Sequence, residues 1–377
     1  MGGIVIAGGG LSAVRTASSL RRKGYDGDLT MLAEEAVAPY DRPPLSKDVL
    51  LGTRDSTTLP FDTDKLAIDL RLGTRAMVLD PAAKQVRVEG SDGPGRVDYD
   101  RLLIATGATP IRMPGDGHQH LLRTADDALA LREKLAPGVR VVLIGGSWIG
   151  AEVATSALAR GCEVICIEAT DMPLAAVLGP QVARHLKHWW EAVQVYTGCP
   201  VSRVDEGRVL LADGIEIEAD VVVTGVGVRP NIGWLADSGL ELNRGVIVDE
   251  HLRTSAPDVV AVGDVTERWS PRAGAHLVGQ HWDDASSGGA VAAATLLGDI
   301  SAGYDPVPYF WSDQFGHKLQ YVGAHGPDDR AVPEFIDDLL SAVSWVDPAG
   351  NLTAWLGIDR PRDVMKARTA VGGPYQP

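Results

Sequence analysis

The chain has 377 residues, of which 45% are hydrophobic, and 50 acidic against 35 basic residues give it a formal net charge of −15. This length favours two or three domains over one core. The acidic excess disfavours nonspecific binding to nucleic acid or to anionic membranes. No apolar run approaches the ~18 residues of a membrane-spanning helix, and the N-terminus has neither a basic stretch nor a cleavage site. We therefore expect a soluble, cytoplasmic protein.

Two segments share one order of elements. Each has a short β-branched strand, a glycine cluster, an apolar-periodic helix, a second strand and then an acidic residue. The first copy runs from Ile4 to Glu34 and the second from Val141 to Glu168. This repeat predicts two nucleotide-binding domains of one design.

The first glycine cluster, Gly8-Gly9-Gly10-Leu11-Ser12-Ala13, matches GxGxxG/A ahead of a helix predicted to end near Arg22. In this motif Gly8 permits the tight turn, Gly10 lets backbone approach a pyrophosphate, and Ala13 lets the helix pack on the strand. Glu34 is expected to bind a ribose hydroxyl, with Glu35 as the neighbouring candidate. The alternative is an ordinary glycine turn followed by two solvated glutamates.

The second cluster, Gly145-Gly146-Ser147-Trp148-Ile149-Gly150, has a serine in the middle glycine position. The Ser147 side chain should crowd the approach of a pyrophosphate, although its hydroxyl is able to donate a hydrogen bond. Glu168 ends the following strand, and no arginine follows it in Ala169-Thr170-Asp171-Met172. A carboxylate there accepts the ribose diol and repels a 2′-phosphate, which favours NADH over NADPH. The alternative is a degenerate copy that binds nothing.

Further strands that end in glycine follow each copy. The segments 102–110, 221–227 and 259–264 have this pattern, and a long alanine-rich helix is predicted near Ala285 to Leu297. From about Tyr304, aromatic-rich strands and an amphipathic stretch near Val332 to Leu340 indicate a third domain. The predicted fold class is α/β, with two Rossmann-like domains and a C-terminal α+β domain. The predicted boundaries are 1–112 with 236–299 for the first dinucleotide-binding domain, 113–235 for the second, which would bind NAD(H), and 300–377 for the third.

The three cysteines, Cys162, Cys166 and Cys199, form neither a CxxC pair nor a disulfide framework. We expect buried, inert thiols, which argues against a disulfide reductase. No zinc cluster and no Ser-His-Asp set is evident in the sequence.

Tyr40-Asp41-Arg42-Pro43-Pro44-Leu45-Ser46-Lys47 resembles a segment of the flavoprotein ferredoxin reductases of oxygenase and cytochrome P450 systems. These are relatives of putidaredoxin reductase and of apoptosis-inducing factor, and the resemblance covers nearly the whole chain. It implies a glutathione reductase-like fold with Lys47 beside the isoalloxazine ring and Glu152, just after the second loop, as its catalytic partner. The alternatives are a surface lysine and an ordinary helix carboxylate.

The resemblance also implies other contacts. Arg42 and Arg123 would bind flavin backbone or diphosphate, Ala76 adenine, and Asp264 the ribityl chain. Gln280-His281-Trp282-Asp283 is similar to the family's EHWDNA stretch, which places Trp282 near the ring. Phe310-Trp311-Ser312-Asp313-Gln314 matches its FWSDQ motif. Core packing is the alternative for these aromatics and for His281. The remaining expected cofactor residues are Leu11, Ser12, Ala105, Thr106, Gly107, Gly263 and His281 for FAD, and Trp148, Ile149, Gly225, Val226 and Gly227 for NAD.

The implied reaction is hydride transfer from NADH to FAD, followed by single-electron transfers to an iron–sulfur ferredoxin. An acidic ferredoxin requires a local basic patch, for which Arg360, Arg362, Lys366 and Arg368 are the candidates, with solvated surface as the alternative. Other possible activities are NADH oxidase or rubredoxin, quinone or nitrite-system reductase. A non-enzymatic alternative is a flavin-bound redox sensor or interaction protein.

Overall fold

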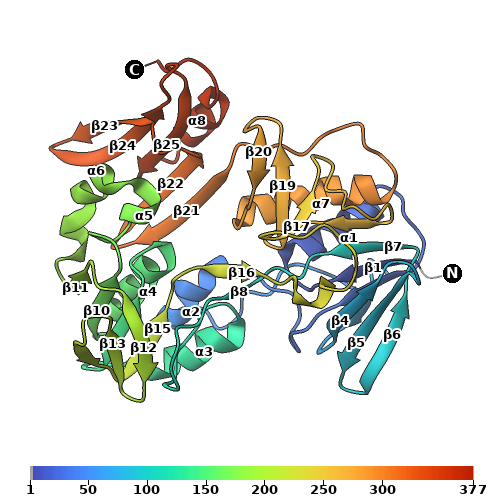
Figure 1. Cartoon of the computed structure of the whole chain (residues 1–377), viewed down its shortest axis with the longest axis horizontal. Coiled ribbons are helices and arrows are strands. Elements are labelled where there is room, and N and C mark those ends of the chain that lie inside the picture. The colour runs from blue at the N-terminus through green and yellow to red at the C-terminus, as the bar shows by residue number, and fades with distance from the viewer. Residues whose placement is uncertain (1–2, 377) are drawn as a thin grey trace. The chain divides into compact units, whose positions relative to one another are not determined.

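The computed structural model describes residues 3–376. The chain forms two compact units, each assembled from three separate stretches (Figure 1). Unit 1 comprises Met1–Asp41, Thr58–Thr109 and Arg229–Pro306, and unit 2 comprises Arg42–Thr57, Pro110–Val228 and Val307–Pro377. The chain passes between the units in two short paired strands, β8 (Ala108–Pro110) and β16 (Val228–Pro230). The three-domain boundaries expected from the sequence remain a prediction.

Unit 1 is built on a five-stranded parallel sheet in the order β18-β7-β1-β2-β3. Its strands are β1 (Ile4–Ala7), β2 (Leu29–Leu32), β3 (Asp69–Arg71), β7 (Arg101–Ile104) and β18 (Val259–Ala261). Two long helices, α1 (Leu11–Arg22) and α7 (Trp282–Leu296), pack against each other. β1 is apolar along its whole length and fully buried, as expected for a central strand covered on both faces.

Two smaller sheets and a short 3₁₀ helix complete unit 1. One is the antiparallel sheet of β4 (Arg75–Asp80), β5 (Gln85–Gly90) and β6 (Gly93–Asp98). The other is formed by β17 (Val246–Val248), β19 (Thr266–Ser270) and β20 (Ala275–Leu277), and the 3₁₀ helix η3 covers Gly233–Leu235. Buried side chains from the central sheet, the antiparallel sheet and both long helices form one continuous hydrophobic core.

Unit 2 contains a second parallel sheet in the order β11-β10-β9-β15. It comprises β9 (Arg140–Ile144), β10 (Glu163–Glu168), β11 (Gln194–Thr197) and β15 (Val221–Thr224), with α3 (Ala125–Lys134) and α4 (Trp148–Ala159) as its longer helices. A small antiparallel sheet joins β12 (Val201–Asp205), β13 (Arg208–Leu211) and β14 (Glu216–Glu218). The shorter helices are η1 (Pro43–Ser46), α2 (Asp48–Leu51), α5 (Ala175–Leu178), α6 (Pro180–Ala183) and η2 (Arg184–Trp190).

The C-terminal part of unit 2 is a five-stranded antiparallel sheet in the order β21-β22-β25-β24-β23. Its elements are β21 (Tyr309–Gln314), β22 (His317–Gly323), β23 (Arg330–Ile336), β24 (Leu339–Val346), β25 (Leu352–Ile358) and helix α8 (Val364–Ala370). One face of the sheet packs with residues of α5, α6 and η2, and the other packs with α8. The stretch Val332 to Leu340, amphipathic in sequence, forms the hairpin between β23 and β24.

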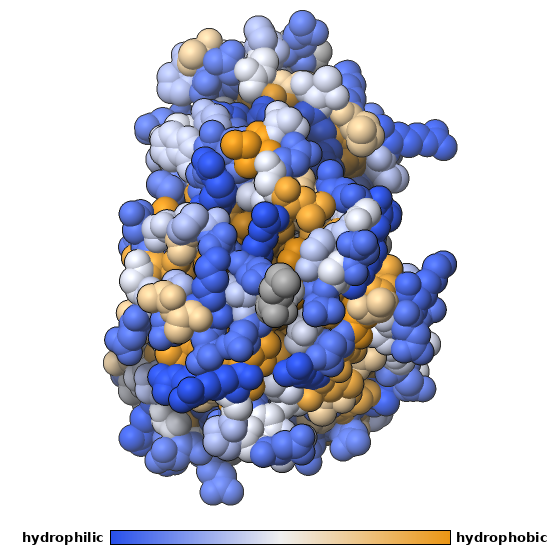
Figure 2. Space-filling model, turned by 90° about the vertical axis from the view of Figure 1, so that its right-hand side faces the viewer, coloured by the Kyte–Doolittle hydropathy of each residue, from blue (hydrophilic) through white to orange (hydrophobic). Residues whose placement is uncertain are grey.

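These elements confirm the predicted fold class of two Rossmann-like α/β domains and a C-terminal α+β part. Hydrophilic side chains cover most of the face shown in Figure 2, and apolar groups are interspersed among them. Over the described residues, no helix combines the length and the apolar character needed to cross a bilayer.

Candidate functional site

The first glycine loop in unit 1 has the geometry of a dinucleotide cradle. Gly8 directly follows β1 with φ +129°, and a Cβ added there would collide with the carbonyl oxygen of Ala105. Gly10 is the extended N-cap residue of α1, and no side chain caps that helix end. Ser12 and Ala13 are buried in the first turn. The N–H groups at this helix end can therefore bind an anionic pyrophosphate, for which the loop leaves no obstructing side chain.

The predicted adenosine-binding residues lie beyond β2. Glu34 forms an exposed ion pair with Arg75 (Oε1–Nε 3.5 Å), and Ala76 follows Arg75 in β4. Glu35 instead accepts a hydrogen bond from the Tyr40 hydroxyl at 2.5 Å. The structure thus brings Glu34 close to the residue before Ala76. The binding of a ribose hydroxyl by Glu34 or Glu35 remains a prediction.

Other expected FAD residues of unit 1 follow the carboxyl ends of neighbouring strands. Ala105, Thr106 and Gly107 come after β7, and the Ala105 N–H donates to the carbonyl of Ala7 at the end of β1. Gly263 and Asp264 come after β18, which pairs with β7. Since carboxyl ends of parallel strands meet at one edge, these segments border the loop at Gly8.

The start of α7 carries His281 as its N-cap and Trp282 as its first residue. The Trp282 Nε1 donates a hydrogen bond to Asp41 Oδ1 at 2.6 Å. Burial lowers the pKa of His281, and the nearby Asp264 carboxylate opposes that shift only in part. A neutral imidazole at this helix end is suited to hydrogen bonding and packing, and less to carrying a proton at neutral pH.

The second glycine loop, in unit 2, repeats this geometry. Gly145 has φ +99°, and a Cβ there would come 2.5 Å from the carbonyl oxygen of Gly225. Ser147 is the N-cap residue of α4 with extended backbone, and its side chain makes no capping hydrogen bond. Ordinary backbone angles accommodate the serine Cβ, and its hydroxyl stays available to a ligand. Ile149 and Val226 are exposed apolar side chains near the loop, while Trp148 packs edge-on against Phe310.

Glu168 is fixed at the end of β10. Its Oε2 accepts the Gly146 N–H at 2.8 Å, and its Oε1 accepts the N–H and the hydroxyl of Thr170, both at 2.9 Å. A carboxylate offers about four lone-pair sites, so one remains for a ribose hydroxyl. The glutamate therefore ties the glycine loop to the strand and presents a stationary negative charge.

Lys47 and Glu152 form the ion pair that the sequence predicted. Lys47 Nζ lies 2.8 Å from Glu152 Oε2, and the carboxylate is buried in α4. Two serines that the sequence analysis missed complete the cluster. Ser46 and Ser312 donate to Oε2 and Oε1 of Glu152 at 2.5 and 2.6 Å. Both belong to motifs quoted above, but only the fold brings them to one carboxylate.

Arg42 and Arg123, expected to bind FAD, belong to unit 2, as Lys47 does. Arg42 precedes η1 and its carbonyl accepts the Leu45 N–H, while Arg123 precedes the capped start of α3. The FAD residues expected from the sequence are thus divided between the two units. Their contacts with the cofactor remain a prediction.

The three cysteines are free, and Cys166 lies on β10 beside Gly146 and Glu168 of the second glycine loop. Burial, together with the nearby Glu168 carboxylate, raises the pKa of the Cys166 thiol to about 12. Burial also raises the pKa of Cys162. Because a thiolate is the reactive species, neither buried cysteine is suited to redox chemistry.

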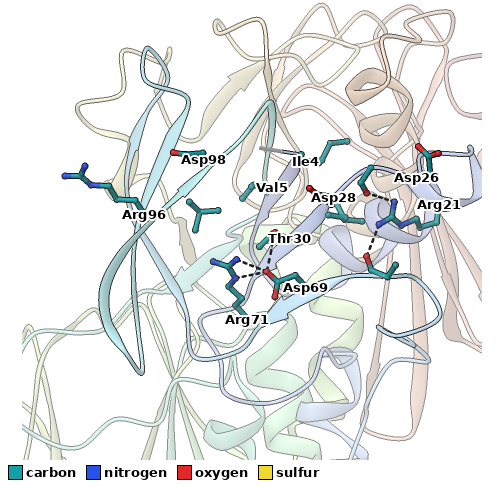
Figure 3. Close-up of a pocket in the computed structure, with 15 residues that line it drawn as sticks. Ile4, Val5, Arg21, Asp26, Asp28, Thr30, Asp69, Arg71, Arg96 and Asp98 are labelled. Atoms are coloured by element: carbon teal, nitrogen blue, oxygen red, sulfur yellow. Dashed lines mark hydrogen bonds and ion pairs between the residues drawn. The ribbon is translucent and has the colours of Figure 1, made fainter. Parts of the chain in front are cut away.

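Unit 1 also contains a polar cavity of about 540 Å³ at the amino ends of β1 and β2, which is the end of the sheet opposite Gly8 (Figure 3). Three of its charged side chains, Asp69, Arg71 and Arg21, are committed to one another or to backbone. Asp69 pairs with Arg71 at 2.7 Å, and Arg21 donates to carbonyl oxygens including those of Leu66 and Ala67. This cavity holds none of the predicted cofactor residues.

Comparison with known proteins agrees with this geometry. Residues 2–289 match the pyridine nucleotide-disulphide oxidoreductase family, and residues 309–376 match the reductase C-terminal domain. The chain is 37% identical to the ferredoxin–NAD(+) reductase component of the anthranilate 1,2-dioxygenase system of Burkholderia cepacia, over 99% of this chain and 95% of that protein.

Two solved structures are similar over nearly the whole chain. The crystal structure of Fdr9 is 51% identical with a TM-score of 0.95, covering 100% of this chain and 96% of that one. Putidaredoxin reductase in its covalent complex with putidaredoxin is 30% identical with a TM-score of 0.90, covering 98% and 92%. These relatives confirm the resemblance drawn from the sequence motifs. The chain belongs to the pyridine nucleotide-disulphide oxidoreductase family and carries that family's reductase C-terminal domain.

Proposed function

We propose that this protein is an FAD-containing, NADH-dependent reductase that delivers single electrons to a ferredoxin serving a cytochrome P450 or another oxygenase. The observation that carries this proposal is the pairing of two dinucleotide loops with three free cysteines, none of which forms a CxxC pair. Gly8 and Gly145 each form a cradle, yet Cys166 is buried with a pKa of about 12. Without a dithiol to receive them, electrons must leave for an acceptor outside the chain.

FAD, when bound, supplies the conversion of a two-electron hydride into single electrons. The chain binds and orients the cofactors. The α1 helix end and Gly10 hold the FAD pyrophosphate, and Glu34 takes the ribose hydroxyls. Glu168 takes the ribose of NADH and repels the 2′-phosphate of NADPH, because three hydrogen bonds hold its carboxylate in place. The Lys47 ammonium, held by Glu152, supplies a fixed positive charge for the electron-transfer site.

The ferredoxin surface is part of this proposal. Arg360 is committed to Glu334 and Asp363 at 2.7 and 2.6 Å, and Arg368 lies over the Tyr309 ring at 5.1 Å. Arg362 and Lys366 are exposed on or next to α8, and neither has an ion-pair partner among residues 3–376. They flank Met365, which is 70% exposed. An apolar centre with basic neighbours is suited to a small acidic ferredoxin. A cytoplasmic location is likewise proposed.

The test compares NADH with NADPH in anaerobic stopped-flow experiments and then measures cytochrome c reduction with putidaredoxin as the probe ferredoxin. We expect rapid bleaching of the flavin by NADH, slower bleaching by NADPH, and cytochrome c reduction that depends on the ferredoxin. Flavin left oxidised by excess NADH would refute the reductase. Oxygen consumption that is equally fast without ferredoxin would favour an oxidase instead.

A further inference from the structure

The two oxygens of the Glu152 carboxylate have different partners. Oε2 receives the Lys47 ammonium at 2.8 Å and the Ser46 hydroxyl at 2.5 Å, both from the segment around η1. Oε1 receives the Ser312 hydroxyl at 2.6 Å from strand β21 of the C-terminal sheet. Ser312 is 0% exposed, and Glu152 is 4% exposed. A residue of the C-terminal sheet therefore contacts the charged pair directly, without intervening solvent.

The direction of these hydrogen bonds is fixed by chemistry. An ionised carboxylate only accepts, so the Ser312 hydroxyl must donate its hydrogen to Oε1. The Ser312 oxygen can then accept, and it does so from Gln314 Nε2 at 3.2 Å. Ser312 and Gln314 are two residues apart on β21 and share one face of the strand. The result is a chain of donors from Gln314 through Ser312 to Glu152.

We propose that Ser312 is a positioning residue that holds the Glu152 carboxylate, and through it the Lys47 ammonium, in the orientation needed for electron entry from NADH. The last torsion of a glutamate side chain is broad and only weakly restricted on its own. Three hydroxyl and ammonium donors on two oxygens restrict it. The Lys47 ammonium also donates to the carbonyl oxygen of Pro43 at 3.2 Å. Glu152 and this carbonyl oxygen together fix two of its three N–H directions.

This inference rests on the proposed NADH-dependent reduction and concerns its first half-reaction alone. Without the Ser312 hydroxyl, Oε1 loses the donor that opposes rotation, and the carboxylate turns. The ammonium moves with it. A displacement of about 1 Å at a reacting centre costs about a hundredfold in rate, so a buried serine can control the step without touching a cofactor.

The experiment measures flavin reduction by NADH under anaerobic conditions, without ferredoxin, in full-length Ser312→Ala. We expect the limiting rate to fall by about tenfold to a hundredfold, with the NADH dissociation constant changed by less than about threefold. Ser344→Ala is the control, because Ser344 is a buried serine on β24 of the same sheet. Its rate should stay within about twofold of the parent. Gln314→Leu, which removes only the second donor, should slow reduction by less than Ser312→Ala.

A double-mutant cycle with Lys47→Ala separates positioning from a general structural role. If Ser312 acts through the ion pair, adding Ser312→Ala to Lys47→Ala should change the rate by less than about twofold. The same fold loss in both backgrounds would overturn the inference, as would parental rates in both Ser312→Ala and Gln314→Leu. Failure of the parent protein to oxidise NADH would instead count against the proposed function.

Discussion

Replacing Gly8 by alanine tests whether the first glycine loop is the FAD site. The φ of +129° is unfavourable for any residue with a Cβ, at a cost of about 1–3 kcal/mol. The new methyl group would also collide with the carbonyl oxygen of Ala105, and the backbone shift that relieves this costs about 1–3 kcal/mol more. Loss of two backbone hydrogen bonds to a pyrophosphate, each about 1.5–3 kcal/mol, would weaken FAD binding at least ~100-fold.

The assay is the flavin content of purified Gly8→Ala, from the ratio of flavin to protein absorbance, followed by titration with FAD. Gly24→Ala is the matched control, because Gly24 also lies in unit 1 with positive φ (+87°) but has nothing within 4 Å of its added Cβ. It should lose about 1–2 kcal/mol of stability and keep its FAD. Equal FAD affinity in the two variants would show that this loop does not bind the pyrophosphate.

Three further outcomes are expected. Glu168→Ala should reduce the preference for NADH over NADPH, measured as the ratio of kcat/KM values, by about tenfold, because the variant neither holds the ribose nor repels a 2′-phosphate. An unchanged ratio would contradict the proposed role of Glu168 in binding the ribose. The double variant Arg362→Glu, Lys366→Glu should raise the KM for ferredoxin about tenfold at low salt. This increase should become smaller as salt is added. The rate of flavin reduction by NADH should not change. For Glu267, burial alone would raise the pKa of the carboxyl group, but hydrogen bonds from Arg244 outweigh burial and lower this pKa. The carboxylate therefore stabilises the fold above pH ~4.3, the ordinary value. This contribution is lost as the pH falls through the lower pKa of the folded state. Arg244→Ala should therefore lower the melting temperature by a few degrees at pH 7, a modest effect because the arginine is 61% exposed, and an equal difference at pH 3 would contradict the linkage.

The glycine loops could be predicted from the sequence because their requirement is local. A positive φ beside a neighbouring carbonyl group admits only glycine, so Gly8 and Gly145 mark the turns by residue type alone. The acidic residue that ends the second strand is equally local. The hydrogen bonds that hold Glu168 could not be predicted in this way, because the donation from Thr170 depends on how the chain turns after β10.

The cluster around Glu152 shows where prediction from sequence ends. Ser46 and Ser312 lie 106 and 160 positions from this glutamate, and no periodicity links residues so far apart. Only the packing of α4 against β21 brings Ser312 to the carboxylate. The hairpin of β23 and β24 is a second case. Apolar and polar residues in this stretch fit more than one periodicity, and pairing with β25 selects the strand.

The central sheet of unit 1 has a consequence for how the protein is made. β18 pairs with β7, and β7 pairs with β1. The sheet is therefore complete only after the chain from Ile104 to Val259 has been synthesised. At ~10 residues per second that delay is on the order of ten seconds or more. Meanwhile the four-stranded sheet of unit 2 becomes complete at Thr224. During synthesis, the sheet of unit 2 is therefore complete before the sheet of unit 1. Until β18 is made, the edge of the apolar strand β7 that pairs with β18 stays uncovered. A chain halted before β18 lacks both Gly263 and α7, and with them part of the proposed FAD site.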